Sequence, residues 1–228
     1  MEKKALKVLV YGGTGSQMGS TVWKLLERGH IPYVLTRSAE KAAPMQQAGA
    51  KVVVGDVTDL DSLVRVSQGM DAVALMIPAF GLNPMNTAKH LDYALSAAKQ
   101  AGVGIVVWNT SGPVLAERIG HPMYDQRLDL IDQVKASGIP SIIVQPTVYA
   151  ENFLGPWTRP FVVEKDLLAY PVPEAMALGW CPTENVGTVI AASLERPDLA
   201  GSRFIVSGLE NLTGPELADR SAGLHSGC

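Results

Sequence analysis

The stretch that decides the fold is Val8-Leu9-Val10-Tyr11-Gly12-Gly13-Thr14-Gly15-Ser16-Gln17-Met18-Gly19, near the N-terminus. Its apolar start predicts a buried strand, its glycines predict a tight turn, and the apolar spacing that follows predicts a helix. Glycine lets the backbone approach a ligand, and the free N–H groups of a helix start favour a phosphate. The pattern Gly12-x-x-Gly15-x-x-Met18 lacks the third glycine of a GxxGxxG motif. The stretch therefore predicts a nucleotide-binding turn, with a βα turn that has spare glycines as the alternative.

Apolar runs and helical patterns then alternate along the chain. We expect strands at 8–11, 33–36, 51–54, 72–77, 104–108 and 141–144, and helices near 16–28, 39–48, 59–67, 85–101 and 123–137. The run Ile105-Val106-Val107-Trp108 is apolar throughout, which is typical of a parallel strand buried on both faces. Pro44 is expected to shorten the second helix. The sequence thus predicts an α/β protein with a doubly wound parallel sheet, the Rossmann fold.

The region after Pro146 changes character. Prolines and aromatic residues gather in 150–182, which predicts irregular structure with little regular helix. Such a segment can wall off a ligand beyond the strand ends, or it can be a packed surface excursion. We then expect a helix at 183–194, a strand at 203–206, and a last helix from the capping box Thr213-Gly-Pro-Glu216 to about 222. The expected organisation is one domain over 1–228, with 150–182 as a flap-like insertion and 207–228 as a short C-terminal lobe, either native or truncated.

Composition argues against several classes of protein. The 228 residues carry 19 Lys and Arg against 22 Asp and Glu, a net charge of −3, which does not suit a nucleic-acid partner. No apolar run approaches the roughly 20 residues that span a bilayer, and the first strand leaves no room for a signal peptide. Two cysteines, Cys181 and Cys228, make no disulfide framework, and four histidines lack metal-ligand spacing. We expect a cytoplasmic monomer or homodimer without a metal, and Cys181 as a buried or half-buried thiol.

The end of the second predicted strand indicates which dinucleotide binds. Rossmann proteins that bind NAD place Asp or Glu there for the ribose hydroxyls, whereas arginine suits a 2′-phosphate. Here Leu35-Thr36-Arg37 ends the strand and Lys41 follows four residues later. Two cations together can hold a dianion. We therefore predict NADP(H) in preference to NAD(H), with solvated surface cations as the alternative interpretation of both residues.

The third and fourth strands end in residues that suit the rest of a nucleotide. Asp56 can accept a hydrogen bond from the adenine amino group while Val57 packs beside the ring. Asp56 or Thr58 could equally cap the helix that follows. Proline cannot continue a strand ladder, so the chain leaves the sheet at Pro78. We expect Ile77 and Pro78 to flank the nucleotide.

Candidate catalytic residues follow the fifth strand. Thr110 and Ser111 could contact a substrate carbonyl, or could only terminate the strand. A short-chain reductase normally carries Tyr-x-x-x-Lys on the next helix, where the lysine lowers the tyrosine pKa. Tyr124 is instead followed by Leu128, so this pair is absent, and Tyr124 is expected to pack on the core. Arg127 could bind the nicotinamide ribose but is a poor proton donor. The weak catalytic candidates are Tyr124, Arg127 and Ser111.

A set of motifs recurs in order along nearly the whole chain. It comprises residues 11–19, 35–37 with Lys41, Gly-Asp-Val-Thr-Asp (55–59), Ala-Ser-Gly-Ile-Pro (136–140), Val-Gln-Pro-Thr-Val-Tyr-Ala-Glu-Asn-Phe (144–153) and Pro-Thr-Glu-Asn-Val-Gly (182–187). This set resembles the NmrA-like family of atypical short-chain dehydrogenase/reductases. The resemblance implies a Rossmann fold with bound NAD(P). It also implies one of two functions. One is an NADPH-dependent reductase of quinones or similar carbonyls, and the other is a non-catalytic sensor that responds to the NADP(H) balance by binding a protein partner.

The resemblance departs from the family at two site residues. Met18 stands where relatives usually have glycine, and Arg127 stands where reductase-like members usually carry lysine. With these exceptions noted, we expect a pyrophosphate loop, a 2′-phosphate site, an adenine site, two nucleotide-flanking residues and a nicotinamide side. The pyrophosphate loop comprises Gly12, Thr14, Gly15, Ser16, Gln17 and Met18, and the 2′-phosphate site comprises Arg37 and Lys41. The adenine site comprises Asp56 and Val57, and the flanking residues are Ile77 and Pro78. The nicotinamide side comprises Arg127, Pro146 and Tyr149, with Asn152 as a weaker candidate.

Overall fold

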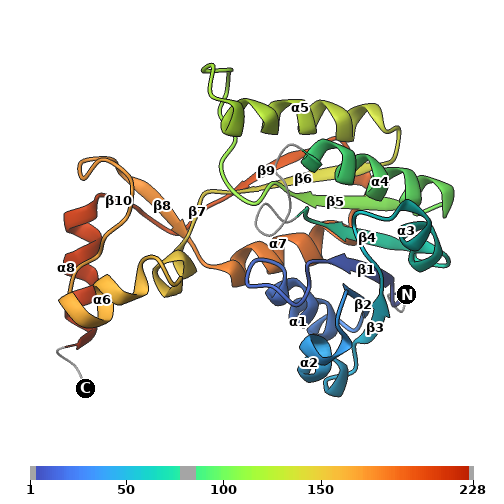
Figure 1. The fold of residues 1–228 in the computed structure, drawn as a ribbon, viewed down its shortest axis with the longest axis horizontal. Helices are drawn as coiled ribbons and strands as arrows, with labels where there is room; N and C mark the ends of the chain where they lie inside the picture. The colour runs from blue at the N-terminus through green and yellow to red at the C-terminus, as the bar shows by residue number, and fades with distance from the viewer. Residues whose placement is uncertain (1–3, 78–85, 226–228) are drawn as a thin grey trace.

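A parallel sheet forms the centre of the computed structural model, which describes residues 4–77 and 86–225 (Figure 1). Its strands, in spatial order, are β3 (Lys51–Val54), β2 (Ile31–Thr36), β1 (Lys7–Tyr11), β4 (Ala72–Leu75), β5 (Ile105–Asn109), β6 (Ser141–Pro146) and β9 (Arg203–Val206). Every neighbouring pair in this sheet runs parallel. The strand order reverses between β1 and β4, and in open α/β sheets such a switch point is where ligands bind.

Helices cover both faces of the sheet (Figure 1). They are α1 (Gly19–Glu27), α2 (Ala43–Gln47), α3 (Leu60–Ser67), α4 (Thr87–Gln100), α5 (Pro122–Ala136) and α7 (Thr183–Leu194), with short 3₁₀ turns η1 (Ala39–Ala42) and η4 (Pro197–Leu199). The side chains of β1 alternate between two cores: Val8 and Val10 pack with α1 and α7, whereas Leu9 and Tyr11 pack with α3 and α4. The predicted doubly wound α/β fold is confirmed.

All seven predicted sheet strands are correct to within two residues at each end, and the deviations of the first two helices have local causes. The strand predicted over 72–77 ends at Leu75. The helix predicted from residue 16 begins at Gly19, because the preceding residues form a turn. Pro44 occupies the first turn of α2, and the residues before it form the 3₁₀ turn η1, so the second helix is shortened as expected.

Two segments, 148–181 and 211–225, build a small lobe that stands to one side of the sheet (Figure 1). It contains β7 (Val148–Tyr149), η3 (Ala150–Leu154), α6 (Arg159–Lys165), β8 (Leu178–Cys181), β10 (Asn211–Leu212) and α8 (Gly214–His225). Strand β8 pairs parallel with β7 and antiparallel with β10. The prediction of little regular helix in 150–182 missed α6 and β8. The predicted capping box is present, since Thr213 N–H donates to Glu216 Oε2 at 2.8 Å, but α8 continues past residue 222.

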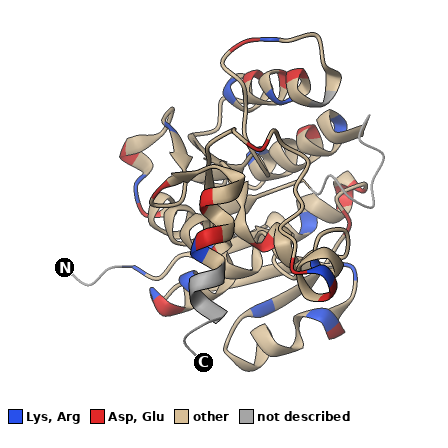
Figure 2. Ribbon diagram, turned by 90° about the vertical axis from the view of Figure 1, so that its left-hand side faces the viewer, with Lys and Arg blue, Asp and Glu red and all other residues tan. Residues whose placement is uncertain are grey.

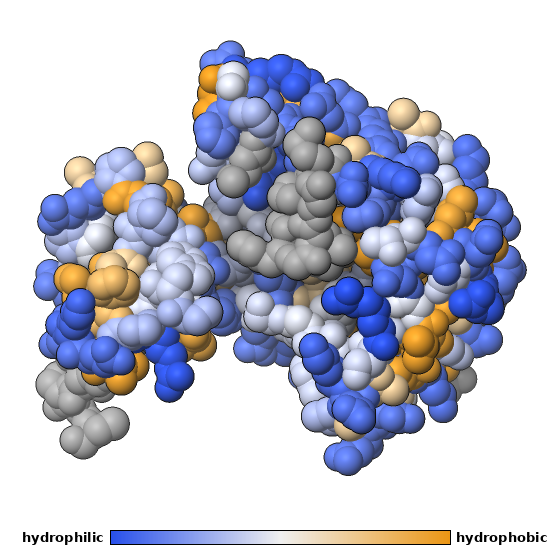
Figure 3. Space-filling view, in the orientation of Figure 1, coloured by the Kyte–Doolittle hydropathy of each residue, from blue (hydrophilic) through white to orange (hydrophobic). Residues whose placement is uncertain are grey.

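The surface differs between the two parts of the chain. Acidic and basic residues are interspersed in the view of Figure 2. Large exposed apolar side chains gather on the small lobe, where Figure 3 shows hydrophobic residues among hydrophilic ones. They include Leu154, Trp157, Phe161, Val163, Leu167 and Met176. Within residues 4–77 and 86–225, no helix combines the length and the apolar character needed to cross a bilayer.

Candidate functional site

The glycine turn between β1 and α1 lies at the switch point of the sheet. Gly12 has φ +69°, and a Cβ at this position would lie 3.0 Å from Met76 Cε. The turn closes through two bonds, Gly15 N–H to Gly12 O and Gly19 N–H to Gly15 O, each 2.9 Å long. Among the described residues, the N–H groups of Ser16 and Gln17 find no acceptor. Such a turn can offer donors to a phosphate.

Met18 does not obstruct this turn. Its side chain is fully buried and packs in the core beneath α1, close to Met76. The backbone of Met18 has φ −115° and ψ −7°, a conformation that any residue can adopt. The backbone at position 18 therefore does not require a glycine. Only the backbone of Met18 is left to face a pyrophosphate, whereas the side chains of Thr14, Ser16 and Gln17 are partly or fully exposed.

The two cations predicted to hold a 2′-phosphate lie just after β2: Arg37 follows the strand, and Lys41 lies in η1. Arg37 and Lys41 are both exposed, and neither forms an ion pair with any described residue. Arg37 is close enough to Asp56 to contribute to lowering the pKa of its carboxyl group. The end of β2, the start of η1 and the end of β3 therefore share one stretch of surface.

Asp56 is held by its own loop. The backbone N–H and the hydroxyl of Thr58 both donate to Asp56 Oδ1 at 2.9 Å, and the backbone bond is the main reason that the pKa of Asp56 lies below its ordinary value. The expected helix cap at Asp56 or Thr58 is wrong, because Asp59 caps α3 by accepting from Ser62 N–H at 3.2 Å. Val57 packs at the edge of the core.

Residues after β4 are described only in part. Ile77 is buried within the core that contains β4 and α4. Pro78, the other residue expected to flank a nucleotide, lies outside the described residues.

A buried amide organises the end of β5. Asn109 Oδ1 accepts the backbone N–H of Ser111 at 2.8 Å, and Asn109 Nδ2 lies 3.1 Å from the hydroxyl of Tyr149. Ser111 has φ +61°. Its hydroxyl donates to Gln17 Oε1 at 2.6 Å, which joins β5 to the glycine turn. The hydroxyl of Thr110 is used within the turn, where it donates to Gly112 O at 2.7 Å. No role was predicted for Asn109 from the sequence. The available signal was a polar residue directly after the apolar run 105–108.

Arg127 extends from α5, and its guanidinium lies beside the turn that follows β5. A Cβ on Gly112 would lie 3.5 Å from Arg127 Nη2, so the arginine stands against the turn that carries Ser111. Arg127 is half-buried, burial lowers its pKa, and no described carboxylate pairs with it. Tyr124 stacks 6.0 Å from the guanidinium and is 37% exposed, so its expected packing on the core is wrong. Leu128 packs on the core instead.

Pro146 and Tyr149 come from the end of β6 and from β7. Pro146 ends β6 and is buried. Tyr149 is buried with its hydroxyl against Asn109, and burial raises its pKa far above the ordinary value, which makes it a poor proton donor. Asn152 lies in η3 of the small lobe, and its Nδ2 donates to the hydroxyl of Tyr170 at 2.7 Å.

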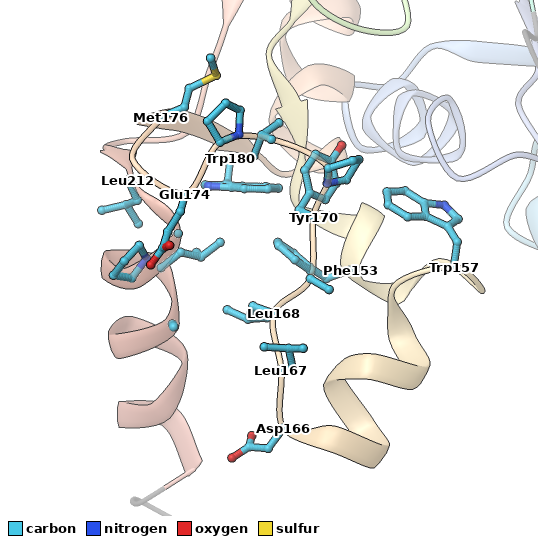
Figure 4. Close-up of a pocket in the computed structure, with 18 residues that line it drawn as sticks. Phe153, Trp157, Asp166, Leu167, Leu168, Tyr170, Glu174, Met176, Trp180 and Leu212 are labelled. Carbon is cyan, nitrogen blue, oxygen red and sulfur yellow. The ribbon is translucent and has the colours of Figure 1, made fainter.

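The small lobe forms an open cavity of about 760 Å³ (Figure 4). Its aromatic lining is centred on Tyr170, whose ring lies 4.9 Å from that of Trp180 and 5.4 Å from that of Trp157. Phe153 completes the aromatic wall at 4.8 Å from Trp180. The described lining residues include the acidic Asp166 and Glu174 but no lysine or arginine. The cavity therefore suits an apolar, conjugated molecule better than an anion.

Sheet order, glycine turn and strand-end loops together define a protein of the dinucleotide-binding Rossmann class. The sequence of residues 4–221 matches the NmrA-like family, and the chain belongs to that family. The resemblance inferred from the motifs is confirmed.

Related proteins include reductases and a regulator. The chain is 28% identical over 215 residues to the NAD(P)H azoreductase of Xenophilus azovorans, covering 92% of this chain and 71% of the azoreductase. It resembles the structure of Citrobacter sp. triphenylmethane reductase complexed with NADP(H), with TM-score 0.78, 18% identity and coverage of 96% and 75%. It also resembles NmrA, a negative transcriptional regulator, with TM-score 0.80, 17% identity and coverage of 97% and 73%. The two structural likenesses support the fold.

Proposed function

We propose that the chain binds NADP(H) across the glycine turn and reduces a small carbonyl or quinone. The observation that carries the proposal is the pair of exposed cations, Arg37 and Lys41, beside that turn, without a carboxylate in ion-pair contact among the described residues. Guanidinium and ammonium groups suit a 2′-phosphate, which distinguishes NADP(H) from NAD(H). Free N–H groups at Ser16 and Gln17 suit the pyrophosphate.

The other end of the site suits a substrate oxygen. The nicotinamide would supply hydride, while the protein supplies orientation and electrostatics. Arg127 lies against Gly112, the residue after Ser111, and its half-buried guanidinium favours negative charge that develops on a carbonyl oxygen. The small lobe, with its aromatic cavity, serves in this proposal as the substrate side of the molecule. The similarity to the azoreductase, whose name states that it uses NAD(P)H, supports a redox role for this chain.

Titration of the purified protein with NADPH, NADH and 2′,5′-ADP tests the cofactor proposal. Arg37→Glu should weaken NADPH and 2′,5′-ADP about tenfold or more, because hydrogen bonds to charged groups contribute about 1.5–3 kcal/mol. NADH affinity should change little. Arg65→Glu, an exposed arginine in the last turn of α3, is the matched control and should leave all three affinities unchanged. An equal loss for NADPH and NADH would remove Arg37 from the 2′-phosphate role.

A second candidate function is an NADP(H) sensor that binds a protein partner without turnover. It is favoured by the lack of an evident proton donor among the residues assigned to the site, since Leu128 replaces the expected lysine and Tyr149 has a raised pKa. Incubation with NADPH and a panel of quinones separates the two functions. Oxidation of NADPH that depends on both protein and quinone supports the reductase. Tight NADPH binding with no oxidation above background supports the sensor for those substrates.

A further inference from the structure

Asn109 is a fully buried polar residue whose amide orientation is determined by its neighbours. The Ser111 N–H can only donate, so the atom that faces it at 2.8 Å must be the amide oxygen. The amide nitrogen then faces the hydroxyl of Tyr149 at 3.1 Å and the sulfur of Met18 at 3.4 Å. Three segments that are distant in sequence therefore meet at one side chain: the end of the glycine turn, the end of β5, and β7.

Ser111 is held in a conformation that it would not favour alone. Its φ of +61° is in the left-handed region, which costs a residue other than glycine roughly 1–2 kcal/mol. Strain of this kind persists only where surrounding bonds enforce it, and it gathers at functional sites. Two side-chain bonds hold Ser111 here: its N–H donates to Asn109 Oδ1 and its hydroxyl donates to Gln17 Oε1. The result is that the Ser111 hydroxyl points across to Gln17 on the glycine turn.

We propose that Asn109 is a positioning residue for the nicotinamide half of the nucleotide. It holds Ser111 left-handed, so that the hydroxyl stands opposite the glycine turn and can bond a nucleotide that runs from this turn toward the end of β5. Gln17 and Ser111 exchange their mutual bond for bonds to that nucleotide. The inference rests on the proposed function, because it requires NADP(H) in this cleft.

Two ligands that differ only on the nicotinamide side test the inference. NADPH and 2′,5′-ADP share the 2′-phosphate, but 2′,5′-ADP lacks the part that would reach Ser111. Ser111→Ala and Asn109→Ala should each weaken NADPH about fivefold, the equivalent of one hydrogen bond, and should leave 2′,5′-ADP unchanged. Asn211→Ala, at an exposed asparagine of β10, is the control and should change neither affinity.

The outcomes separate this inference from the proposed function. If the unaltered protein binds neither ligand, the proposed function fails and the inference fails with it. If it binds both and the variants keep full NADPH affinity, the inference is overturned while NADP(H) binding stands. An equal loss for NADPH and 2′,5′-ADP would show a general structural role for Asn109, which also overturns it.

A double-mutant cycle in thermal stability keeps the inference testable if Asn109→Ala folds poorly. Glycine adopts positive φ without strain, so Ser111→Gly removes the need for Asn109 to hold the backbone. Asn109→Ala should then lower the melting temperature less in the Ser111→Gly background than in the unaltered protein. The same loss in both backgrounds would show that Asn109 does not hold Ser111, and would overturn the inference.

Discussion

Substitution of Met18 by alanine should lower stability while leaving cofactor affinity intact. The side chain is fully buried, and alanine removes its three heavy atoms beyond Cβ. Counting each as a buried methylene at about 0.8 kcal/mol gives about 2.4 kcal/mol. Incomplete relaxation of the cavity adds to this, within the range of about 2–5 kcal/mol seen for Met→Ala changes in cores. Met18 makes no side-chain cap of α1, so no capping loss is added.

Chemical and thermal unfolding measure this effect. A loss of about 3 kcal/mol corresponds to a melting temperature about 6–12 °C lower for a chain of this size. Met176→Ala is the matched control, because this methionine is exposed on the small lobe and its truncation should cost less than about 0.5 kcal/mol. NADPH affinity of the folded Met18→Ala protein should stay within about twofold of the original, since the side chain points into the core.

One result would refute this reasoning. If Met18→Gly, which restores the third glycine of the motif, tightened NADPH binding tenfold without a loss of stability, the methionine would have to obstruct the phosphate. The buried position of its side chain beneath α1 would then be wrong.

Three further predictions concern α7, the buried thiol and Arg127. Gly187→Ala should lower stability by about 1–3 kcal/mol, because the new Cβ would lie 2.8 Å from the Thr21 backbone N in α1; unchanged unfolding would show that the two helices separate freely. In a Cys228→Ser background, Cys181 should react with a disulfide reagent at pH 8 only after unfolding, because burial raises its pKa to about 11; rapid reaction of the native protein would contradict this. Arg127→Ala should weaken NADPH binding if the guanidinium reaches the ribose, and calorimetry showing unchanged affinity would exclude that contact.

The central sheet could be predicted because its signals are local. Strands such as 105–109 are apolar at almost every position, and burial on both faces requires that composition. Gly12 marks the turn because only glycine adopts φ +69° at little cost so close to Met76. The cations at the end of β2 could be found from their position after a predicted strand. Each of these features is readable within a window of a few residues.

The small lobe and the Asn109 contacts could not be predicted in this way. Strands β7 and β10 contain two residues each, too few to show a period, and their partner β8 is distant in sequence. Asn109 and Tyr149 are forty residues apart, so their pairing depends on the sheet having formed. The orientation of Met18 had no sequence signal either, because a methionine in a turn can point to solvent or to the core.

The segment 148–154 connects the nucleotide side of the molecule to the aromatic cavity of the small lobe. Tyr149 meets Asn109 at one end of the segment, and Asn152, three residues later, bonds Tyr170 at the centre of the cavity. The same segment pairs with β8, where Tyr149 lies opposite Cys181 and Val148 opposite Trp180. The aromatic cavity and the contacts of Asn109 therefore share the segment 148–154 as a common support.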